Sequence, residues 1–230
     1  MASEEYPQRT LAFTYQPQAE VLRTAEDLNA IMQERRSVRA ISDRPVPKAV
    51  IEQLIRIAGS APSGANKQPW TFCAISDPEL KSRIRIAAEA EERESYDRRM
   101  NDEWLEDLRP IGTDWRKPFI ETAPWIIVVM RKAWDLREDG SRGQTYYSQE
   151  SVGIATGFLL SAIHHVGLVA LTHTPSPMTF LQELLERPAN ERAYMLIPVG
   201  YPEEGATVPD IQRHPLERIG VFYETVTNQD

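Results

Sequence analysis

The pattern of apolar and polar residues predicts alternating helices and strands. Between Pro47 and Gly59, apolar residues recur at i, i+3, i+4 and i+7, the spacing of an amphipathic helix. Residues 124–131 hold a continuous apolar run, and residues 69–77 are similarly rich in apolar and aromatic residues. Such runs are typical of buried strands. We therefore expect both strands to lie in the interior of a sheet.

A long helix is predicted over about 148–166, and it is apolar around most of its circumference. Such a helix must be covered on several sides. A second copy of the chain is one source of that cover, because an obligate dimer interface resembles a core cut in half. This helix therefore favours a homodimer.

The remaining segments give a mixed order of helices and strands. Further expected elements are a helix over about 26–36, a charged helical segment over about 78–118, strands near 167–173 and 193–199, and a short helix around Leu181 and Leu184. Residues 1–24 show no sustained period, which predicts an extended N-terminal arm on the body or on a second subunit. Residues 25–230 contain no repeat or linker, so we expect one α+β domain.

Composition narrows the function without specifying it. The 230 residues carry 26 Lys+Arg against 34 Asp+Glu, and a net charge of -8 disfavours nucleic acid as a partner. No apolar run reaches the roughly 18 residues of a membrane span, and the N-terminus lacks a signal-peptide pattern, so we expect a cytoplasmic protein with no membrane partner. The single cysteine, Cys73, lies in an apolar run and is expected to pack.

Residues 35–39 form a candidate anion-binding segment. Arg35, Arg36 and Arg39 place three guanidinium groups within five residues, and Ser37 adds a hydroxyl beside Val38. Arginine donors match phosphate oxygens in geometry and charge. The same residues also fit a solvated helix end whose arginines complement the helix dipole. The residues alone leave both interpretations open.

A loop of small residues follows at 61–65, with the sequence Ala-Pro-Ser-Gly-Ala, and Gln68, Pro69 and Trp70 lead from it into a strand. Small side chains allow a planar ligand to approach the backbone and its N–H groups. An ordinary helix-to-strand connection explains the same residues.

Together, these two segments in this order and spacing resemble the nitroreductase superfamily of FMN enzymes. Within it, residues from about 35 to 215 are most similar to the iodotyrosine deiodinases, including Gly200-Tyr201-Pro202 and the later Ala206-Thr207-Val208-Pro209-Asp210. The resemblance implies a nitroreductase-like mixed sheet flanked by helices. It also implies an intertwined homodimer whose FMN sites span both subunits.

The resemblance assigns an FMN-binding set. Its members are Arg35, Arg36, Ser37, Val38, Arg39, Pro62, Ser63, Thr172, His173, Thr174 and Arg213. Thr174 takes the position whose hydroxyl approaches flavin N5, so it is the expected catalytic residue. His173 departs from the threonine of the animal enzymes. Its side chain either points into the core or faces the flavin, where its charge would tune the reduction potential with pH.

The resemblance also assigns a substrate lid at about 88–118. Glu92 and Tyr96 are four residues apart on one helix face, and Lys117 follows. A solvated amphipathic helix with ordinary ion pairs explains these residues equally well from the sequence alone. In the deiodinases the same three positions hold the ammonium and carboxylate of iodotyrosine, and the backbone N–H at the position of Ala65 meets the phenolate oxygen. An anion, a cation and a hydroxyl complement such a zwitterion.

The expected function is FMN-dependent reductive dehalogenation of iodotyrosine or bromotyrosine to tyrosine and halide. No Gly-x-Gly-x-x-Gly segment is present, so an external electron donor is expected, and no metal site is expected. One alternative is a broad NAD(P)H-dependent nitroreductase or flavin reductase. A second is a non-catalytic flavin-binding protein whose acidic lid binds a partner.

Overall fold

The computed structural model describes residues 6–224, in two units that divide between Arg35 and Arg36. The first unit consists of an extended stretch and helix α1 (Gln18–Glu34). This helix begins earlier than the expected residue 26, so it includes part of the predicted arm. No residue of α1 is buried, and Val21, Leu22 and Leu28 are each more than half exposed. Local features stabilise the start: Pro17 is the N-cap, and Arg23 pairs with Glu20 at 2.6 Å.

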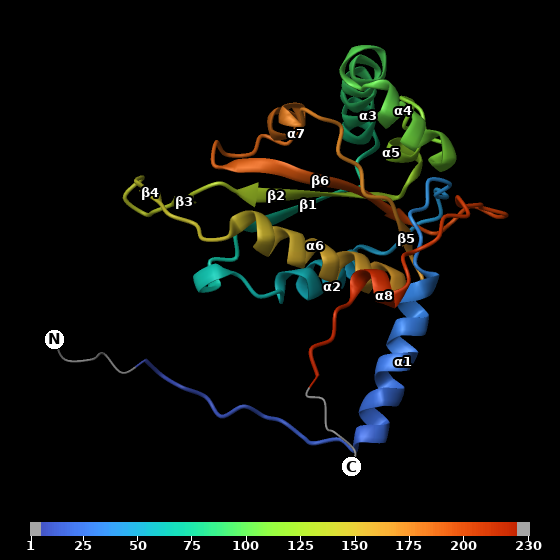
Figure 1. The fold of residues 1–230 in the computed structure, drawn as a ribbon. Helices are drawn as coiled ribbons and strands as arrows, with labels where there is room; N and C mark the ends of the chain where they lie inside the picture. Colours follow the sequence, from blue (N-terminus) through green and yellow to red (C-terminus); the bar gives the residue numbers. More distant parts are fainter. Residues whose placement is uncertain (1–5, 225–230) are drawn as a thin grey trace. The chain divides into compact units, whose positions relative to one another are not determined.

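The second unit is built on a four-stranded sheet in the order β1-β2-β6-β5 (Figure 1). The strands are β1 (Trp70–Ile75), β2 (Trp125–Lys132), β6 (Glu191–Gly200) and β5 (Val169–Ala170). All three strand pairs are antiparallel. Among the described residues, a parallel bridge joins Ser37 to Ala170 at the sheet edge. The expected strand over 167–173 is thus reduced to two residues, with a separate bridge between His173 and Leu196.

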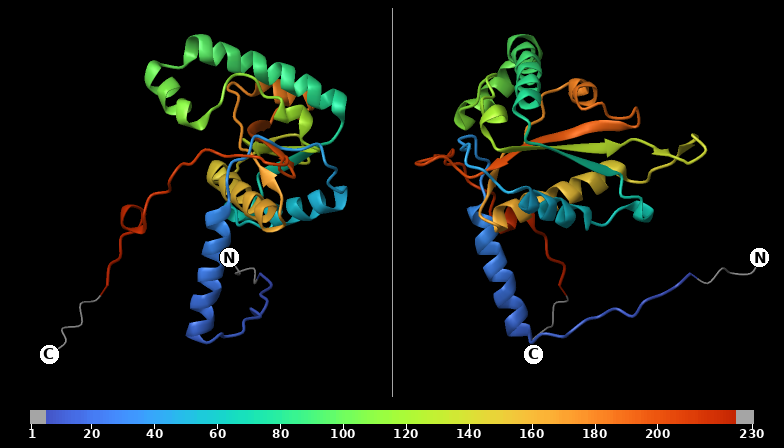
Figure 2. Two further views of the ribbon diagram at one scale, coloured as in Figure 1. Left: turned by 90° about the vertical axis from the view of Figure 1, so that its right-hand side faces the viewer. Right: turned by 180° about the vertical axis from the view of Figure 1, so that it is seen from behind.

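Helices cover both faces of this sheet, as Figures 1 and 2 show. One face carries α2 (Lys48–Gly59) and α6 (Ser148–His165), and the other carries α3 (Pro78–Glu94), α5 (Phe119–Thr122) and α7 (Thr179–Leu184). Ile127 packs in the core on the α2 and α6 side, while Ile126 and Val128 pack in the opposite core. Burial on both faces explains the continuous apolar run of β2. The expected α+β sheet flanked by helices is confirmed.

Local sequence sets the boundaries of α2 and the start of α3 as predicted. Helix α2 has Pro47 as its N-cap and ends at Gly59, and its apolar stripe, which includes Ile51 and Leu54, is buried. Helix α3 begins where the side chain of Asp77 accepts a hydrogen bond from the N–H of Leu80 at 2.7 Å.

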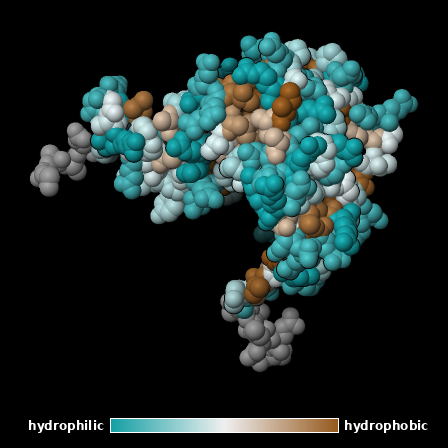
Figure 3. All heavy atoms as spheres, turned by 90° about the horizontal axis from the view of Figure 1, so that it is seen from above, coloured by the Kyte–Doolittle hydropathy of each residue, from teal (hydrophilic) through white to brown (hydrophobic). Residues whose placement is uncertain are grey.

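The charged segment after β1 is helical as expected, although not to its end. It runs through α3, a π-helical turn η2 (Ser95–Arg99), α4 (Asp102–Leu108) and the 3-10 turn η3 (Arg109–Ile111), and then continues as a loop to Pro118. Figure 3 shows that the face carrying α3 and α4 is mainly hydrophilic with small hydrophobic patches.

Two further segments lie outside the sheet. A hairpin of β3 (Asp135–Leu136) and β4 (Arg142–Gly143) connects β2 to α6, and the chain after β6 is largely exposed and contains the short helix α8 (Leu216–Ile219). Within residues 6–224, no helix has the length and apolar character needed to cross a membrane.

Candidate active site

A cavity of about 240 Å³ lies between the lid and the sheet edge. Its lining includes Arg39 from the arginine segment, and also Glu92, Tyr96, Lys117, Thr172, His173 and Thr174. The structure therefore brings together residues from three segments that the sequence analysis had assigned to cofactor and substrate. The sequence alone did not show that these three segments meet.

The charges of Glu92 and Lys117 form a nearly buried ion pair. Lys117 Nζ lies 3.2 Å from Glu92 Oε2, and the two side chains are 4% and 12% exposed. The ammonium of Lys117 also donates to Thr113 Oγ1 at 3.3 Å and to the carbonyl of Asp114. Buried charges require such partners, because desolvation disfavours an unpaired ion. Lys117 is thus fixed as a cation that faces the cavity.

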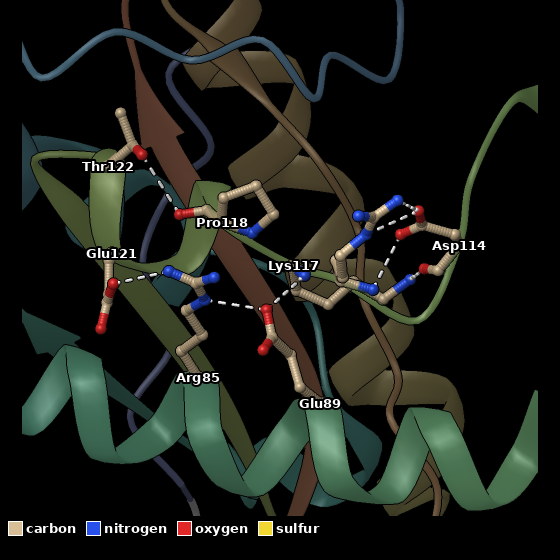
Figure 4. Close-up of polar contacts among 8 residues, drawn as sticks. Arg85, Glu89, Asp114, Lys117, Pro118, Glu121 and Thr122 are labelled. Atoms are coloured by element: carbon tan, nitrogen blue, oxygen red, sulfur yellow. Dashed lines mark hydrogen bonds and ion pairs between the residues drawn. The ribbon is translucent and has the colours of Figure 1, made fainter.

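The backbone at Lys117 is held by a chain of charged side chains from α3 (Figure 4). The N–H of Lys117 donates to Glu89 Oε1 at 2.7 Å, and Arg85 donates to the same carboxylate oxygen at 2.8 Å. Arg85 also reaches Glu121 of α5 at 2.7 Å. This network ties the loop to two helices, so it positions Lys117 relative to Glu92.

Tyr96 supplies a neutral hydroxyl at the same end of the cavity. It lies in η2, and π-helical turns of this kind often mark functional sites. Its hydroxyl donates to the carbonyl of Thr113 at 3.2 Å, and the Lys117 ammonium is 5.7 Å from the ring centroid. Burial raises the pKa of Tyr96 above its ordinary value, so the hydroxyl remains protonated at neutral pH.

His173 faces this charged group rather than the interior of the sheet. Two backbone hydrogen bonds to Leu196, each 2.9 Å, fix its position beside β6, and its ring packs edge-on to Phe119 with centroids 5.9 Å apart. Its Nε2 lies 4.0 Å from Glu92 Oε1 and is buried without a hydrogen-bond partner. Burial, then the nearby Lys117 and Arg39, lower the pKa of His173 to about 3, so the ring is neutral at physiological pH.

Thr172 and Thr174 flank His173 and differ from it in exposure. Both threonines are exposed and line the cavity, whereas the histidine is buried. Alternation of side chains along an extended segment explains this difference. Two hydroxyls are therefore accessible to a ligand, while the imidazole lies beneath the lid.

The arginine segment contributes unevenly to the cavity. Arg39 lines it, burial lowers the pKa of this guanidinium, and its Nε is buried without a hydrogen-bond partner. Val38 is buried, and its N–H donates to the carbonyl of Ala170 at 3.1 Å, which anchors the segment to β5 together with the Ser37 bridge. Arg36 follows the unit boundary, and Arg35 is the C-cap of α1 in the first unit.

The loop at 61–68 has a constrained backbone. Ala65 and Gln68 have positive φ angles of 49° and 46°, which residues other than glycine rarely adopt. A Cβ at Gly64 would lie 2.7 Å from the carbonyl oxygen of Tyr146, so only glycine fits there. The Ser63 hydroxyl accepts from the N–H of Gln68 at 2.9 Å and helps to hold this conformation.

Eight predicted residues lie outside the cavity lining: Arg35, Arg36, Ser37, Val38, Pro62, Ser63, Ala65 and Arg213. Pro62 and Ser63 belong to the constrained loop, and Arg213 lies in the exposed segment after β6. Three other residues of the site were not indicated by the sequence. Thr113 orients Tyr96, Phe119 packs against His173, and Glu89 holds the backbone of Lys117. No sequence pattern marks them, because each contact depends on how the loop before α5 folds over α3.

Comparison with known proteins identifies the family to which the chain belongs. A family model described as the nitroreductase family matches residues 32–201, which include the sheet, the lid and the cavity. A curated iodotyrosine deiodinase from Haliscomenobacter hydrossis is 59% identical over 89% of this chain and 92% of the relative. Iodotyrosine deiodinase 1 from Homo sapiens is 43% identical over 89% of this chain and 71% of the relative. The chain therefore belongs to the nitroreductase family and, within it, to the iodotyrosine deiodinases.

A solved structure agrees with this assignment. A crystal structure of oxidized iodotyrosine deiodinase bound to FMN and 3-iodo-L-tyrosine has a TM-score of 0.72 and 30% identity, and the alignment covers 86% of this chain and 99% of that one. The nitroreductase-like fold expected from the sequence is thus confirmed.

Proposed function

We propose that this protein is an FMN-dependent enzyme that reductively removes iodide or bromide from a halogenated tyrosine. The observation that carries the proposal is the buried pair of Glu92 and Lys117, with the Tyr96 hydroxyl, in one cavity with Thr172 and Thr174. The relatives named iodotyrosine deiodinase, and the related structure bound to FMN and 3-iodo-L-tyrosine, support it.

The charge arrangement suits a zwitterionic amino acid. In this structure the carboxylate of Glu92 and the ammonium of Lys117 satisfy each other at 3.2 Å. An amino acid offers one group of each sign, so Glu92 can exchange Lys117 for the substrate ammonium while Lys117 takes the substrate carboxylate. Neither buried charge is then left unpaired. A ligand with only one charge leaves one partner uncompensated, which is costly in a desolvated site.

The residues present also fit FMN. The buried, unpartnered Nε of Arg39 suits an anionic or carbonyl group, and the exposed Thr172 and Thr174 hydroxyls are free to meet a ring edge. In the loop at 61–68 the N–H groups of Asn66, Lys67 and Gln68 donate within the loop, so the N–H of Ala65, at positive φ, is the donor that we assign to a ligand. With them we assign FMN binding to Arg35, Arg36, Ser37, Val38, Pro62, Ser63 and Arg213, whereas the buried His173, also expected there, faces Glu92.

Dehalogenation consumes two electrons and one proton, breaks the carbon–halogen bond, forms a carbon–hydrogen bond and releases halide. Bound FMN would supply the electrons. The chain's own residues bind and orient: Glu92 and Lys117 hold the amino acid, Tyr96 donates its hydroxyl, and the N–H of Ala65 meets the phenol oxygen. With FMN bound, Thr174 would offer its hydroxyl to the flavin ring edge. Closure by the lid excludes water and strengthens each polar contact.

We further propose that the active form is a homodimer reduced by an external electron donor. Ile154 and Phe158 of α6 are 44% and 41% exposed, and exposed apolar residues continue at Phe222 near the C-terminus. A second copy of the chain would cover such residues, as in an obligate dimer.

The test uses the purified holoprotein. After anaerobic reduction, 3-iodotyrosine should reoxidise the bound flavin and yield tyrosine and iodide, while tyrosine should leave it reduced. Flavin absorbance and product chromatography measure both results. A reduced protein that iodotyrosine cannot reoxidise would overturn the proposal. Fast direct oxidation of NADPH with nitroaromatics, together with inert iodotyrosine, would identify a broad nitroreductase instead.

A further inference from the structure

We infer that His173 is a positioning residue for substrate recognition, which donates a hydrogen bond from Nε2 to Glu92 while Glu92 holds the substrate ammonium. This inference rests on the proposed function and adds a specificity-determining contact to it. Its starting point is the buried Nε2 that has no partner in this structure and lies 4.0 Å from Glu92 Oε1.

The environment of the ring explains why a contact is expected. A buried polar atom without a hydrogen bond destabilises the folded state by about 1–3 kcal/mol. His173 is 8% exposed, and Phe119 covers one side of its ring. Glu92 is the nearest acidic group to Nε2, so a shift of about 1 Å would bring its carboxylate oxygen into the usual hydrogen-bond range.

The carboxylate of Glu92 would make that shift when it exchanges Lys117 for the substrate ammonium as its ion-pair partner. In this structure Glu92 is drawn toward Lys117 through Oε2, which leaves Oε1 directed at His173 but too distant to bond. When the substrate carboxylate draws Lys117 away, Glu92 loses one donor. A carboxylate accepts several hydrogen bonds, so it can hold the substrate ammonium and the imidazole N–H together. The histidine then fixes the carboxylate in the orientation that the ammonium requires.

The charge of the ring is suited to this role. The charged groups that face His173 are Glu92 on α3, Lys117 in the loop before α5 and Arg39 in the arginine segment. The two cations, together with burial, favour the neutral ring, and the nearby carboxylate favours the tautomer with its proton on Nε2. A neutral donor supports Glu92 without competing for it, whereas an imidazolium would repel the substrate ammonium.

The experiment compares His173→Leu with His173→Gln in the FMN-loaded protein. Two ligands are titrated while flavin absorbance is followed: 3-iodotyrosine, and its analogue that lacks the amino group, 3-(4-hydroxy-3-iodophenyl)propanoate. The leucine variant should bind iodotyrosine about tenfold or more weakly, as expected for a lost hydrogen bond to a charged group, and the analogue should be much less affected. In turnover, the loss should appear in KM more than in kcat.

The glutamine variant tests whether the donor itself matters. Its amide can donate without charge, so it should recover most of the iodotyrosine affinity. Arg83→Leu, which places the same leucine at an exposed position of α3 outside the cavity lining, is the control and should leave both affinities unchanged. Equal loss of both ligands in His173→Leu, no loss of either, or no recovery with glutamine would overturn the inference. If the wild-type protein itself does not bind iodotyrosine, the proposed function fails rather than the role of His173.

Discussion

Replacement of Glu92 by glutamine removes the negative charge of the lid while keeping its size and a hydrogen-bonding end. In the folded protein, Lys117 loses its ionic partner at 3.2 Å but keeps Thr113 Oγ1 and the Asp114 carbonyl as acceptors. Removing one partner of a buried pair typically destabilises by about 3–5 kcal/mol. Because two acceptors remain, we expect a loss of about 1–3 kcal/mol. For a chain of this length, that lowers Tm by roughly 2–12 °C.

The effect on binding should be similar in size to the effect on folding. A hydrogen bond to a charged group contributes about 1.5–3 kcal/mol, so iodotyrosine affinity should fall about 10- to 150-fold. FMN content should remain that of the wild type. Flavin absorbance titrations with 3-iodotyrosine give the dissociation constant, and the analogue without an amino group shows whether the loss is specific to the ammonium.

The matched control is Glu94→Gln on the same helix. The Glu94 side chain is 40% exposed and pairs with Arg98 at 3.3 Å outside the cavity lining, so its removal should leave iodotyrosine affinity unchanged. Wild-type affinity in Glu92→Gln, or an equal loss with the analogue, would refute the role of Glu92 as the ammonium partner.

Three further predictions concern the cofactor side of the site and the pH dependence of stability. Arg39→Leu should weaken FMN binding about tenfold or more, measured by flavin release on dilution, because its half-buried guanidinium, with Nε unpartnered, is the cation assigned to the flavin. Thr174→Ala should retain FMN but lower the rate of reoxidation by iodotyrosine about 2- to 13-fold, measured by stopped-flow absorbance, since one neutral hydrogen bond is lost. The pKa of His173 is lowered to about 3 in the folded protein, so below the unfolded value of about 6.5 the unfolded chain binds the extra proton and stability falls as pH falls. Denaturation at pH 7.5 and 4.5 should therefore show an acid loss about 2–3 kcal/mol smaller in His173→Leu than in the wild type, and equal losses would contradict a buried neutral histidine.

The spacing of apolar residues predicted most of the helices and strands, because each buried face requires apolar residues at regular positions. Helix α2 lies where its apolar stripe and the flanking Pro47 and Gly59 placed it, and β2 coincides with the apolar run over 124–131. The first turns of α1 were missed although Val21, Ala25 and Leu28 have helical spacing, and none of its residues is buried. The strand over 167–173 was overestimated: its ladder with β6 ends at Ala170, Leu171 still donates to the carbonyl of Pro198 at 3.4 Å, and His173 forms only an isolated bridge to Leu196.

For the site, the sequence determined the chemical inventory: an arginine segment, a loop of small residues, two threonines and a lid with charges of both signs. It also placed the chain among FMN enzymes through the order of these motifs. Only the tertiary structure decided that Glu92 and Lys117 neutralise each other, that Thr113 orients both Lys117 and Tyr96, and that His173 faces Glu92. The physical reason is that local patterns record which residues are buried, whereas the pairing of buried charges depends on how distant segments fold against one another.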